Sequence, residues 1–530
     1  MKTTCIIYRL SNHIHPNFPI HLGSDKVQEN YRTMNGASQR TVHSSTNAGQ
    51  QKDSDETINK CKKTYILRLL LTLNSKPQTP YLQTMTEKPK LKLFDLTMIV
   101  VGLVIGMGIF RTSSDAANAA ITPSLFFIGW VAGGLIALCG ALTYAEIGSR
   151  FPVTGGYYKV FAECYHPSIA FSINCIILIS NAASMAGVAL VGSEYISQVI
   201  FKVDPETTTK AFIAMVPILL FYGVNLLGLR MSSTAQNILM IIKIGMLLLL
   251  ISSIFFITGD ANVSTGVVRE FSAMDQIKSF GLILIAVSFT YGGYQQTINF
   301  GDEVHQPRKT IPRGIFIGIL IIITLYLLVS YAYYNAIGFE DLKTSRGIAS
   351  IVAEKMFGPT GRTVASILLF VAVLAYVNVL LLSNPRVMYA MAKDGILPKA
   401  FSKKNEKRDV LTVGLTAFAA IGIVVLFFMD SFNKILSFTI FLDSIGMATS
   451  AATIFILRKR TKHLDGTGIY KMKLYPLLPL IFIAAYIFVG ISIAFDTPKL
   501  AAIATGVFAG FLLLYFLVTS MKKKTNERTA

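Results

Sequence analysis

The chain contains about twelve apolar segments, each long enough to cross a lipid bilayer as a helix. Of its 530 residues, 52% are hydrophobic and only 15% are charged, which is more apolar surface than a water-soluble domain buries. Lipid offers the backbone no hydrogen-bond partners, so the pattern predicts an all-α polytopic membrane protein. The predicted spans are residues 95–118, 124–149, 168–198, 211–229, 233–258, 279–302, 314–338, 362–391, 411–430, 434–457, 474–495 and 499–520.

The net charge of +20 does not predict nucleic-acid binding, because of where the basic residues lie. Lys and Arg collect in alternate loops, which is the positive-inside pattern of membrane proteins. With the N-terminus inside, about 26 basic residues fall in the even-numbered turns and the C-terminal tail, against about 11 in the outer loops. The pattern predicts a multi-pass protein of the cell (inner) membrane with both termini in the cytoplasm.

Residues 1–84 are polar and show no sustained helical or strand periodicity, so we expect them to be disordered. The extreme N-terminus also lacks the apolar core of a signal peptide. Met85 begins a short basic stretch that leads directly into the first span. Two interpretations stay open: translation begins at Met85, or residues 1–84 are a regulatory tail. The membrane domain is expected at 85–521, followed by a cytoplasmic tail at 521–530.

The cysteine and histidine positions disfavour several kinds of site. None of the five cysteines lies in a predicted outer loop, so no structural disulfide is expected. All seven histidines fall outside the predicted spans, which removes the usual ligands of an intramembrane metal or haem centre. We therefore expect no metal, no cofactor and no enzymatic activity. The chain also lacks a GxxxxGK[ST] motif, so ATP-driven transport by this chain is unsupported.

Two predicted spans are interrupted by glycines, at GMGIF (106–110) and at SFTYGGY (288–294). A glycine in the middle of a span allows the helix to unwind, which frees backbone N–H and C=O groups that lipid cannot satisfy but a buried ligand can. The two breaks open two comparable blocks of spans. Breaks at corresponding positions of two halves predict a transporter with its substrate site near the membrane midplane.

Four motifs together resemble the amino acid-polyamine-organocation superfamily, and most of all its L-type amino acid transporter branch and bacterial relatives. They are GMGIF (106–110), YAEIGSRFPVTGGYY (144–158), SFTYGGYQQTINFGDEVHQPRKTIPRGI (288–315) and NPRVMYAMAKDGILPK (384–399). The resemblance covers about residues 92–520. It implies a five-plus-five inverted repeat with broken helices one and six. The first repeat would be 95–258 and the second 279–457, with two extra helices in 474–520.

An amino acid substrate needs hydrogen-bond donors for its carboxylate and acceptors for its ammonium. The N-terminus of the outer half of span one supplies donors, and the ends of the inner half of span one and the first half of span six supply carbonyls. For either break alone, close helix packing through small residues explains the glycines as well. The candidate substrate-binding residues are Ile105, Gly106, Met107, Gly108, Phe289, Thr290, Tyr291 and Gly292.

Two of these candidates bear on the substrate's size. Relatives often carry a small hydroxyl residue at the position of Met107, so a methionine there either narrows the pocket or packs away from it. Phe289 matches the aromatic residue that, in the resemblance, closes over the substrate from outside; composition alone favours an ordinary lipid-facing role.

Lys243 lies deep in the fifth predicted span, where a charge costs roughly 2.5–3.5 kcal/mol on insertion scales. In proton-coupled and exchanging relatives, a lysine at the matching position approaches the unwound part of span one and occupies the place of sodium. Its protonation would then be linked to the geometry of the site. The alternative is a lysine whose stem reaches the inner interface.

Other polar residues in the spans are weaker candidates. Asp443 in span ten is a second candidate for coupling or gating, or it faces a wet vestibule. Asn181, Ser184 and Asn378 are candidate pocket walls, although hydrogen bonds between helices explain them equally well. At the cytoplasmic ends, charged residues are expected to form ion pairs and conformational latches. These are Glu146, Arg150, Glu303, Arg308 and Arg386.

The sequence favours a secondary amino acid transporter that works by alternating access. Proton symport and amino acid exchange both stay open, as do an amine or polyamine substrate and, from a different class, a channel. The expected partners are an amino acid, protons and the lipid bilayer. L-type relatives in eukaryotes pair with a glycoprotein through a cysteine after span three. The corresponding loop here, residues 201–210, has no cysteine, so we expect no disulfide-linked heavy chain.

Overall fold

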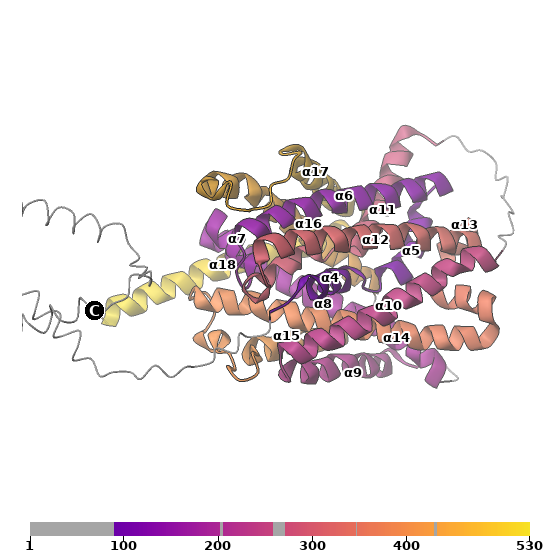
Figure 1. The fold of residues 1–530 in the computed structure, drawn as a ribbon, viewed down its shortest axis with the longest axis horizontal. Helices are drawn as coiled ribbons and strands as arrows, with labels where there is room; N and C mark the ends of the chain where they lie inside the picture. The colour runs from indigo at the N-terminus through magenta and orange to yellow at the C-terminus, as the bar shows by residue number, and fades with distance from the viewer. Residues whose placement is uncertain (1–89, 202–204, 258–270, 346, 429–431, 530) are drawn as a thin grey trace, which may run out of the picture. The chain divides into compact units, whose positions relative to one another are not determined.

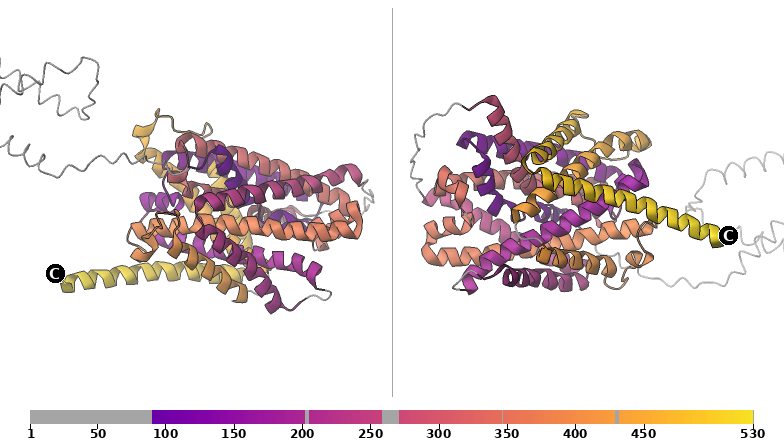
Figure 2. Two further views of the ribbon diagram at one scale, coloured as in Figure 1. Left: turned by 60° about the horizontal axis from the view of Figure 1, so that its bottom comes forward. Right: turned by 180° about the vertical axis from the view of Figure 1, so that it is seen from behind.

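The computed structural model describes residues 90–201, 205–257, 271–345, 347–428 and 432–529. These residues form helices, with only isolated bridges in place of strands. The predicted N-terminal extension, residues 1–84, and the proposed start at Met85 lie outside the described residues. Figure 1 shows the long helices running side by side, and Figure 2 shows the same bundle from two further directions.

Each predicted span is present as a helix. Among the described residues, eleven helices are long and apolar enough to cross a membrane. The twelfth apolar helix is α15, 17 residues long. The helices of the first block are α4 (Leu93–Val104), α5 (Gly108–Ala119), α6 (Pro123–Arg150), α7 (Gly156–Cys164), α8 (Pro167–Ile200), α9 (Thr207–Leu226) and α10 (Leu229–Phe256).

The second block begins with another interrupted helix. Its elements are α11 (Ala273–Tyr291), η1 (Tyr294–Asn299), η2 (Gly301–Glu303), α12 (Pro307–Ile337), α13 (Phe339–Thr344), α14 (Ile348–Lys393), η3 (Lys399–Ser402), α15 (Thr412–Phe428) and α16 (Phe432–Arg460). The chain ends with η4 (Lys462–Leu464), α17 (Leu477–Asp496) and α18 (Pro498–Thr529). The predicted all-α polytopic fold is confirmed.

Helix packing follows the pattern expected of an inverted repeat. α6 packs against α12, α8 against α14 and α9 against α15, so spans two, three and four each meet their counterparts seven, eight and nine. The broken spans pair in the same way, because α4 packs against η1 while α5 packs against α11. The first part of each broken span meets the last part of the other, so the two spans run antiparallel. The two broken helices therefore cross the bundle in opposite directions, as an inverted repeat requires.

Two elements differ from the predicted spans. The second half of span six, expected to continue to residue 302, is a pair of short 3₁₀ helices, η1 and η2. Span eight is preceded by a further helical segment that joins it at Gly358, whose φ of 68° is not helical. Glycine allows the backbone angles of both interruptions.

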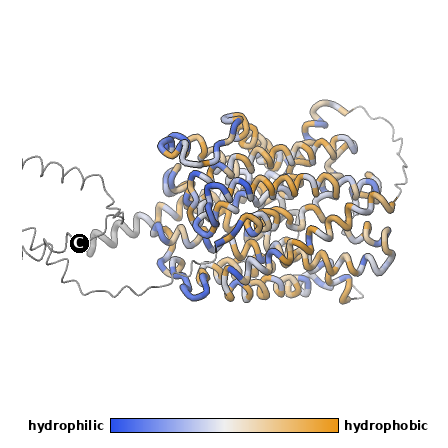
Figure 3. The backbone as a smooth tube through the Cα atoms, viewed as in Figure 1, coloured by the Kyte–Doolittle hydropathy of each residue, from blue (hydrophilic) through white to orange (hydrophobic). Residues whose placement is uncertain are grey.

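The sides of the helical bundle are apolar, whereas the loops at one end are hydrophilic. The helices carry large exposed apolar side chains, among them Phe255 and Phe495 at 84% and 85% exposure, which suits contact with lipid. Hydrophilic loops gather at the same end of the bundle as the C-terminus (Figure 3). This is the end at which the basic loops were expected.

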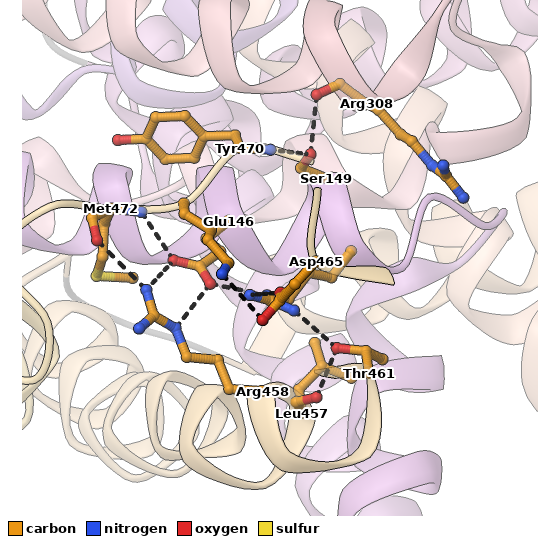
Figure 4. A network of polar contacts seen from close by, with 11 residues as sticks. Glu146, Ser149, Arg308, Leu457, Arg458, Thr461, Asp465, Tyr470 and Met472 are labelled. Atoms are coloured by element: carbon orange, nitrogen blue, oxygen red, sulfur yellow. Dashed lines mark hydrogen bonds and ion pairs between the residues drawn. The ribbon is translucent and has the colours of Figure 1, made fainter. Parts of the chain in front are cut away.

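A buried ion cluster joins three elements at that end (Figure 4). Glu146 on α6 is fully buried and accepts hydrogen bonds from Arg150 at 2.7 Å and from two nitrogens of Arg458 on α16, at 2.7 and 2.8 Å. The backbone N–H of Met472 donates to the same carboxylate at 2.9 Å. Arg150 also pairs with Asp465 at 3.1 Å. The cluster ties span two to span ten and to the segment before α17.

Ser149 extends this connection to span seven. Its hydroxyl donates to the carbonyl of Arg308 at 2.8 Å and accepts from the N–H of Tyr470 at 2.9 Å (Figure 4). Arg308 itself donates to Thr467 rather than to a carboxylate. The expected ion pairs are thus present for Glu146 and Arg150, while Arg308 contributes hydrogen bonds.

Replacing Glu146 with alanine is expected to lower the free energy of unfolding by about 3–5 kcal/mol, because it removes the buried carboxylate that pairs with both Arg150 and Arg458. Thermal unfolding of the purified protein measures the change. The matched control is Glu340→Ala, which removes an exposed carboxylate paired with Lys343 and should cost at most about 1 kcal/mol. Equal melting temperatures for the two variants would contradict the prediction.

Candidate substrate site at two broken helices

The first break lies between α4 and α5. The N–H of Ile105 closes the last helical bond, to Val101, and the N–H of Gly106 turns back to Val104 at 2.7 Å. The helix resumes when Phe110 donates to the carbonyl of Met107 at 3.1 Å. In the described part of the chain, no hydrogen bond uses the N–H groups of residues 107, 108 and 109. The N-terminus of α5 therefore presents three unused backbone donors in the middle of the bundle.

The second break follows Tyr291, the last residue of α11. Gly292 is extended, and Gly293 has a φ of 116°, which favours glycine. A Cβ atom on Gly293 would lie 2.1 Å from the carbonyl oxygen of Leu103, so only glycine allows this approach to α4. Within the described residues, no backbone N–H bonds the carbonyl of Thr290 or Tyr291. This break presents unused acceptors.

The two breaks touch each other. Thr112 on α5 and Thr290 on α11 are hydrogen-bonded through their hydroxyls at 2.6 Å. A Cβ atom on Gly108 would lie 2.8 Å from the Thr290 hydroxyl and 3.0 Å from its Cα, so the first turn of α5 lies directly on the end of α11. On the inner side, the Tyr326 hydroxyl donates to the carbonyl of Val104 at 3.1 Å. Donors from one broken helix and acceptors from the other thus lie next to one another.

Lys243 reaches the first break from α10. Its side chain is 1% exposed, and its ammonium donates to the carbonyl of Ile105 at 2.5 Å. None of the described carboxylates forms an ion pair with it. The lysine stem therefore does not run to the inner interface. The ammonium lies at the unwound part of span one, where the resemblance suggested it.

The candidate residues Met107 and Phe289 have different surroundings. Met107 is completely buried in the core, whereas Phe289 is half-buried against it. Tyr376 on α14, which the sequence analysis did not single out, lies beside the break: a Cβ atom on Gly106 would be 3.2 Å from its ring. The available signal was a tyrosine in the middle of an apolar span. Its hydroxyl is 2.8 Å from that of Ser184, so Ser184 is also near the break.

Asn181 and Asn378 belong to hydrogen-bond networks between helices. Asn181 donates to Asn384 at 2.7 Å and accepts from Gln296 at 2.9 Å, which connects α8, α14 and η1. Asn378 accepts from Asn225 at 2.9 Å and joins α14 to α9 and α10. Asn181 therefore holds the element that follows the second break, while Asn378 lies among helix contacts outside both breaks.

The fourth polar candidate, Asp443 on α16, is half-buried and accepts a hydrogen bond from Ser180 at 2.8 Å. Arg386 on α14 forms a two-pronged ion pair with Glu303 of η2, at 2.6 and 3.0 Å. The Arg386 guanidinium also stacks 4.5 Å from the ring of Phe300. This ion pair joins span eight to the end of span six.

Among the described residues, no three His, Cys, Asp or Glu side chains lie close enough to hold an ion. The described cysteines Cys139, Cys164 and Cys175 are free thiols.

Antiparallel broken helices with unused backbone donors and acceptors at the centre of an all-helical bundle define a secondary transporter. Residues 91–520 match the sequence model of the family described as amino acid permease, and the chain belongs to that family. The resemblance to the amino acid-polyamine-organocation superfamily is thereby confirmed, and secondary amino acid transport is the function of this multi-pass membrane protein.

Curated relatives agree with this assignment. The chain is 27% identical to the serine/threonine exchanger SteT of Bacillus subtilis, over 76% of this chain and 91% of that protein. It is 25% identical to the human large neutral amino acids transporter small subunit 2, over 81% of this chain and 80% of that protein. It is 24% identical to the mouse b(0,+)-type amino acid transporter 1, over 82% of this chain and 90% of that protein.

Proposed function

We propose that the protein carries neutral amino acids by alternating access, with the substrate's zwitterionic backbone bound between the two broken helices. The observation that carries this proposal is the pairing of unused N–H groups at residues 107–109 with unused carbonyls at Thr290 and Tyr291. The donors lie at a helix N-terminus, whose partial positive charge favours a carboxylate. The carbonyls suit the ammonium group. Ile105, Gly106 and Gly292 complete the backbone of the site.

The same arrangement argues against an amine or polyamine substrate. Such a molecule has no carboxylate, so three backbone donors at the start of α5 would stay unsatisfied in a buried site, which is costly. The names of the relatives point the same way, since they describe an exchanger of serine and threonine and a transporter of large neutral amino acids. A channel would not need matched donors and acceptors at one point of its path.

We propose that Lys243 couples the opening of the substrate site to proton symport or to amino acid exchange, and that sodium has no role. Its ammonium donates to the carbonyl of Ile105, so a cation already occupies the unwound part of span one. Loss of that bond would leave the carbonyl free and would change the end of α4. A protonation step at Lys243 and the opening of the site would then be coupled.

The wild-type protein is expected to take up a neutral amino acid into proteoliposomes equally well with sodium and with choline as the external cation. The physical reason is that the ammonium of Lys243 replaces the sodium ion. Uptake is measured with radiolabelled substrate under an imposed pH gradient, and separately against amino acid loaded inside. A requirement for sodium would contradict the coupling role, whereas no saturable amino acid uptake under any condition would contradict the transport function.

Three further parts of this proposal rest on the sequence. The transporter domain begins at Met85, which agrees with a family match that starts at residue 91. Both termini face the cytoplasm, since the basic loops lie at one end. The protein works without a disulfide-linked heavy chain, because residues 201–210 contain no cysteine. The role of Phe289 as the outer cover of the substrate also remains part of the proposal.

A further inference from the structure

Asp443 is an ionisable residue that the backbone site does not use. It lies on α16 within a predicted span, where an acidic side chain is expensive and is retained for a function. The Ser180 hydroxyl donates to one of its oxygens at 2.8 Å, and no ion pair involves it among the described residues. A carboxylate with a single hydroxyl donor has further capacity to accept hydrogen bonds.

The groups around Asp443 are hydroxyls from several elements. Besides Ser180 on α8, the tyrosines Tyr157 on α7, Tyr376 on α14 and Tyr486 on α17 lie within electrostatic range of its carboxylate. Because these neighbours come from four elements of the bundle, the carboxylate points inward. Its partial exposure is therefore toward the interior of the bundle rather than toward lipid.

Tyr376 connects this internal space to the substrate site. Its ring lies against the backbone of Gly106 in the first break, and its hydroxyl is hydrogen-bonded to Ser184 at 2.8 Å. Ser180 and Ser184 are one helical turn apart on α8, so they lie on the same face. Ser180 is hydrogen-bonded to Asp443, and Ser184 is hydrogen-bonded to Tyr376. Asp443 and Tyr376 are both half-buried.

We propose that Asp443, together with Tyr376 and Ser184, receives the side chain of the substrate and selects amino acids whose side chain donates a hydrogen bond. This inference rests on the proposed binding of the amino acid backbone between the two breaks. A side chain that leaves the break past Gly106 would meet the ring of Tyr376, and Asp443 lies within electrostatic range of that tyrosine. The Tyr376 and Ser184 hydroxyls already bond each other, whereas the Asp443 carboxylate keeps unused acceptor capacity beyond its bond from Ser180.

The choice between a polar and an apolar side chain follows from desolvation. A side-chain hydroxyl that reaches Asp443 replaces the water lost by the carboxylate, whereas an aliphatic side chain leaves it unsatisfied. A site that hydrogen-bonds a substrate hydroxyl strongly rejects an analogue without that hydroxyl. An apolar pocket discriminates much less between two ligands that differ by one methyl group. Threonine and valine have nearly the same shape and differ in this hydroxyl, so they isolate the effect.

The experiment compares dissociation constants of L-threonine and L-valine for the purified full-length protein. The wild type is expected to bind threonine at least about tenfold more tightly than valine. Asp443→Leu should abolish this preference by weakening threonine while leaving valine unchanged or tighter. Asp443→Asn should keep most of the preference, because the amide oxygen still accepts a hydrogen bond.

The matched control is Ser444→Ala on the neighbouring position of α16. The Ser444 hydroxyl donates to Ile440 within the same helix, and its side chain lies toward Gly490 on α17. This variant should keep the wild-type preference.

Wild-type protein that binds both amino acids equally would overturn the inference while leaving the proposed function intact. Equal weakening of both ligands by Asp443→Leu would also overturn it, since that result marks a structural role. An Asp443→Asn variant that keeps its preference but loses uptake driven by a pH gradient would add a coupling role and retain the selectivity. If the wild type binds no amino acid at all, the proposed function fails instead.

Discussion

Lys243→Ala is expected to reduce the accumulation of substrate driven by a pH gradient by at least about tenfold, with a smaller effect on binding. The wild-type ammonium joins α10 to the carbonyl of Ile105 at the end of α4. Without it, a change of protonation on span five no longer alters the break in span one. The backbone donors at the start of α5 stay in place, so the substrate keeps most of its contacts.

Proteoliposomes with an imposed pH gradient test this prediction, with binding followed separately by ligand-induced thermal stabilisation. The matched control is Gly245→Ala, two residues further along α10, where an added Cβ atom meets no other atom within 4 Å. That control should accumulate substrate normally. A Lys243→Ala variant that still concentrates substrate would show that the ammonium is not the coupling group. Asp443 would then be the next candidate for coupling.

Gly108→Val is expected to raise the substrate's dissociation constant by roughly a hundredfold or more, because displacements of about 1 Å cost this much at sites that depend on orientation. The valine Cβ atom would lie 3.0 Å from the Cα of Thr290, a backbone atom that cannot move away alone. The two breaks would have to separate. β-Branching adds to the conflict at the first turn of α5.

Thermal stabilisation by substrate measures the loss, and membrane insertion is checked by yield and by a single elution peak. Gly245→Val provides the control for the size and shape of the new side chain, since nothing lies within 4 Å of its Cβ position. A Gly108→Val protein that is stabilised as strongly as the wild type would remove span one from the binding site.

The sequence by itself determined the number and the approximate limits of the spans. For example, the segment expected at 124–149 is observed at Pro123–Arg150, and the one at 168–198 at Pro167–Ile200. The reason is local. A helix that crosses the membrane needs a continuous apolar segment of sufficient length, and hydropathy along the sequence shows that length independently of how the helices pack. The glycines at both breaks were equally visible, because backbone freedom is a property of the residue itself.

The motifs also identified the family before any packing was known. They could not establish how span six continues after its break. The 3₁₀ form of η1 and η2 depends on the close approach of Gly293 to Leu103, which belongs to a different helix. Nor could hydropathy reveal the helical segment that joins α14 at Gly358, because residues 348–357 are too few to cross a bilayer.

Only the tertiary structure decided which polar residues meet. Lys243 and Ile105 are 138 positions apart, and Ser184 and Tyr376 are 192 apart. Asn378 was a candidate for the pocket wall, yet the rotation of α14 directs it toward α9 and α10 and brings Tyr376, two residues earlier, to the break. Adjacent residues on a helix differ by about 100° in direction, so the faces that meet are set by how helices pack. That packing is a property of the whole bundle, which no single segment of the sequence contains.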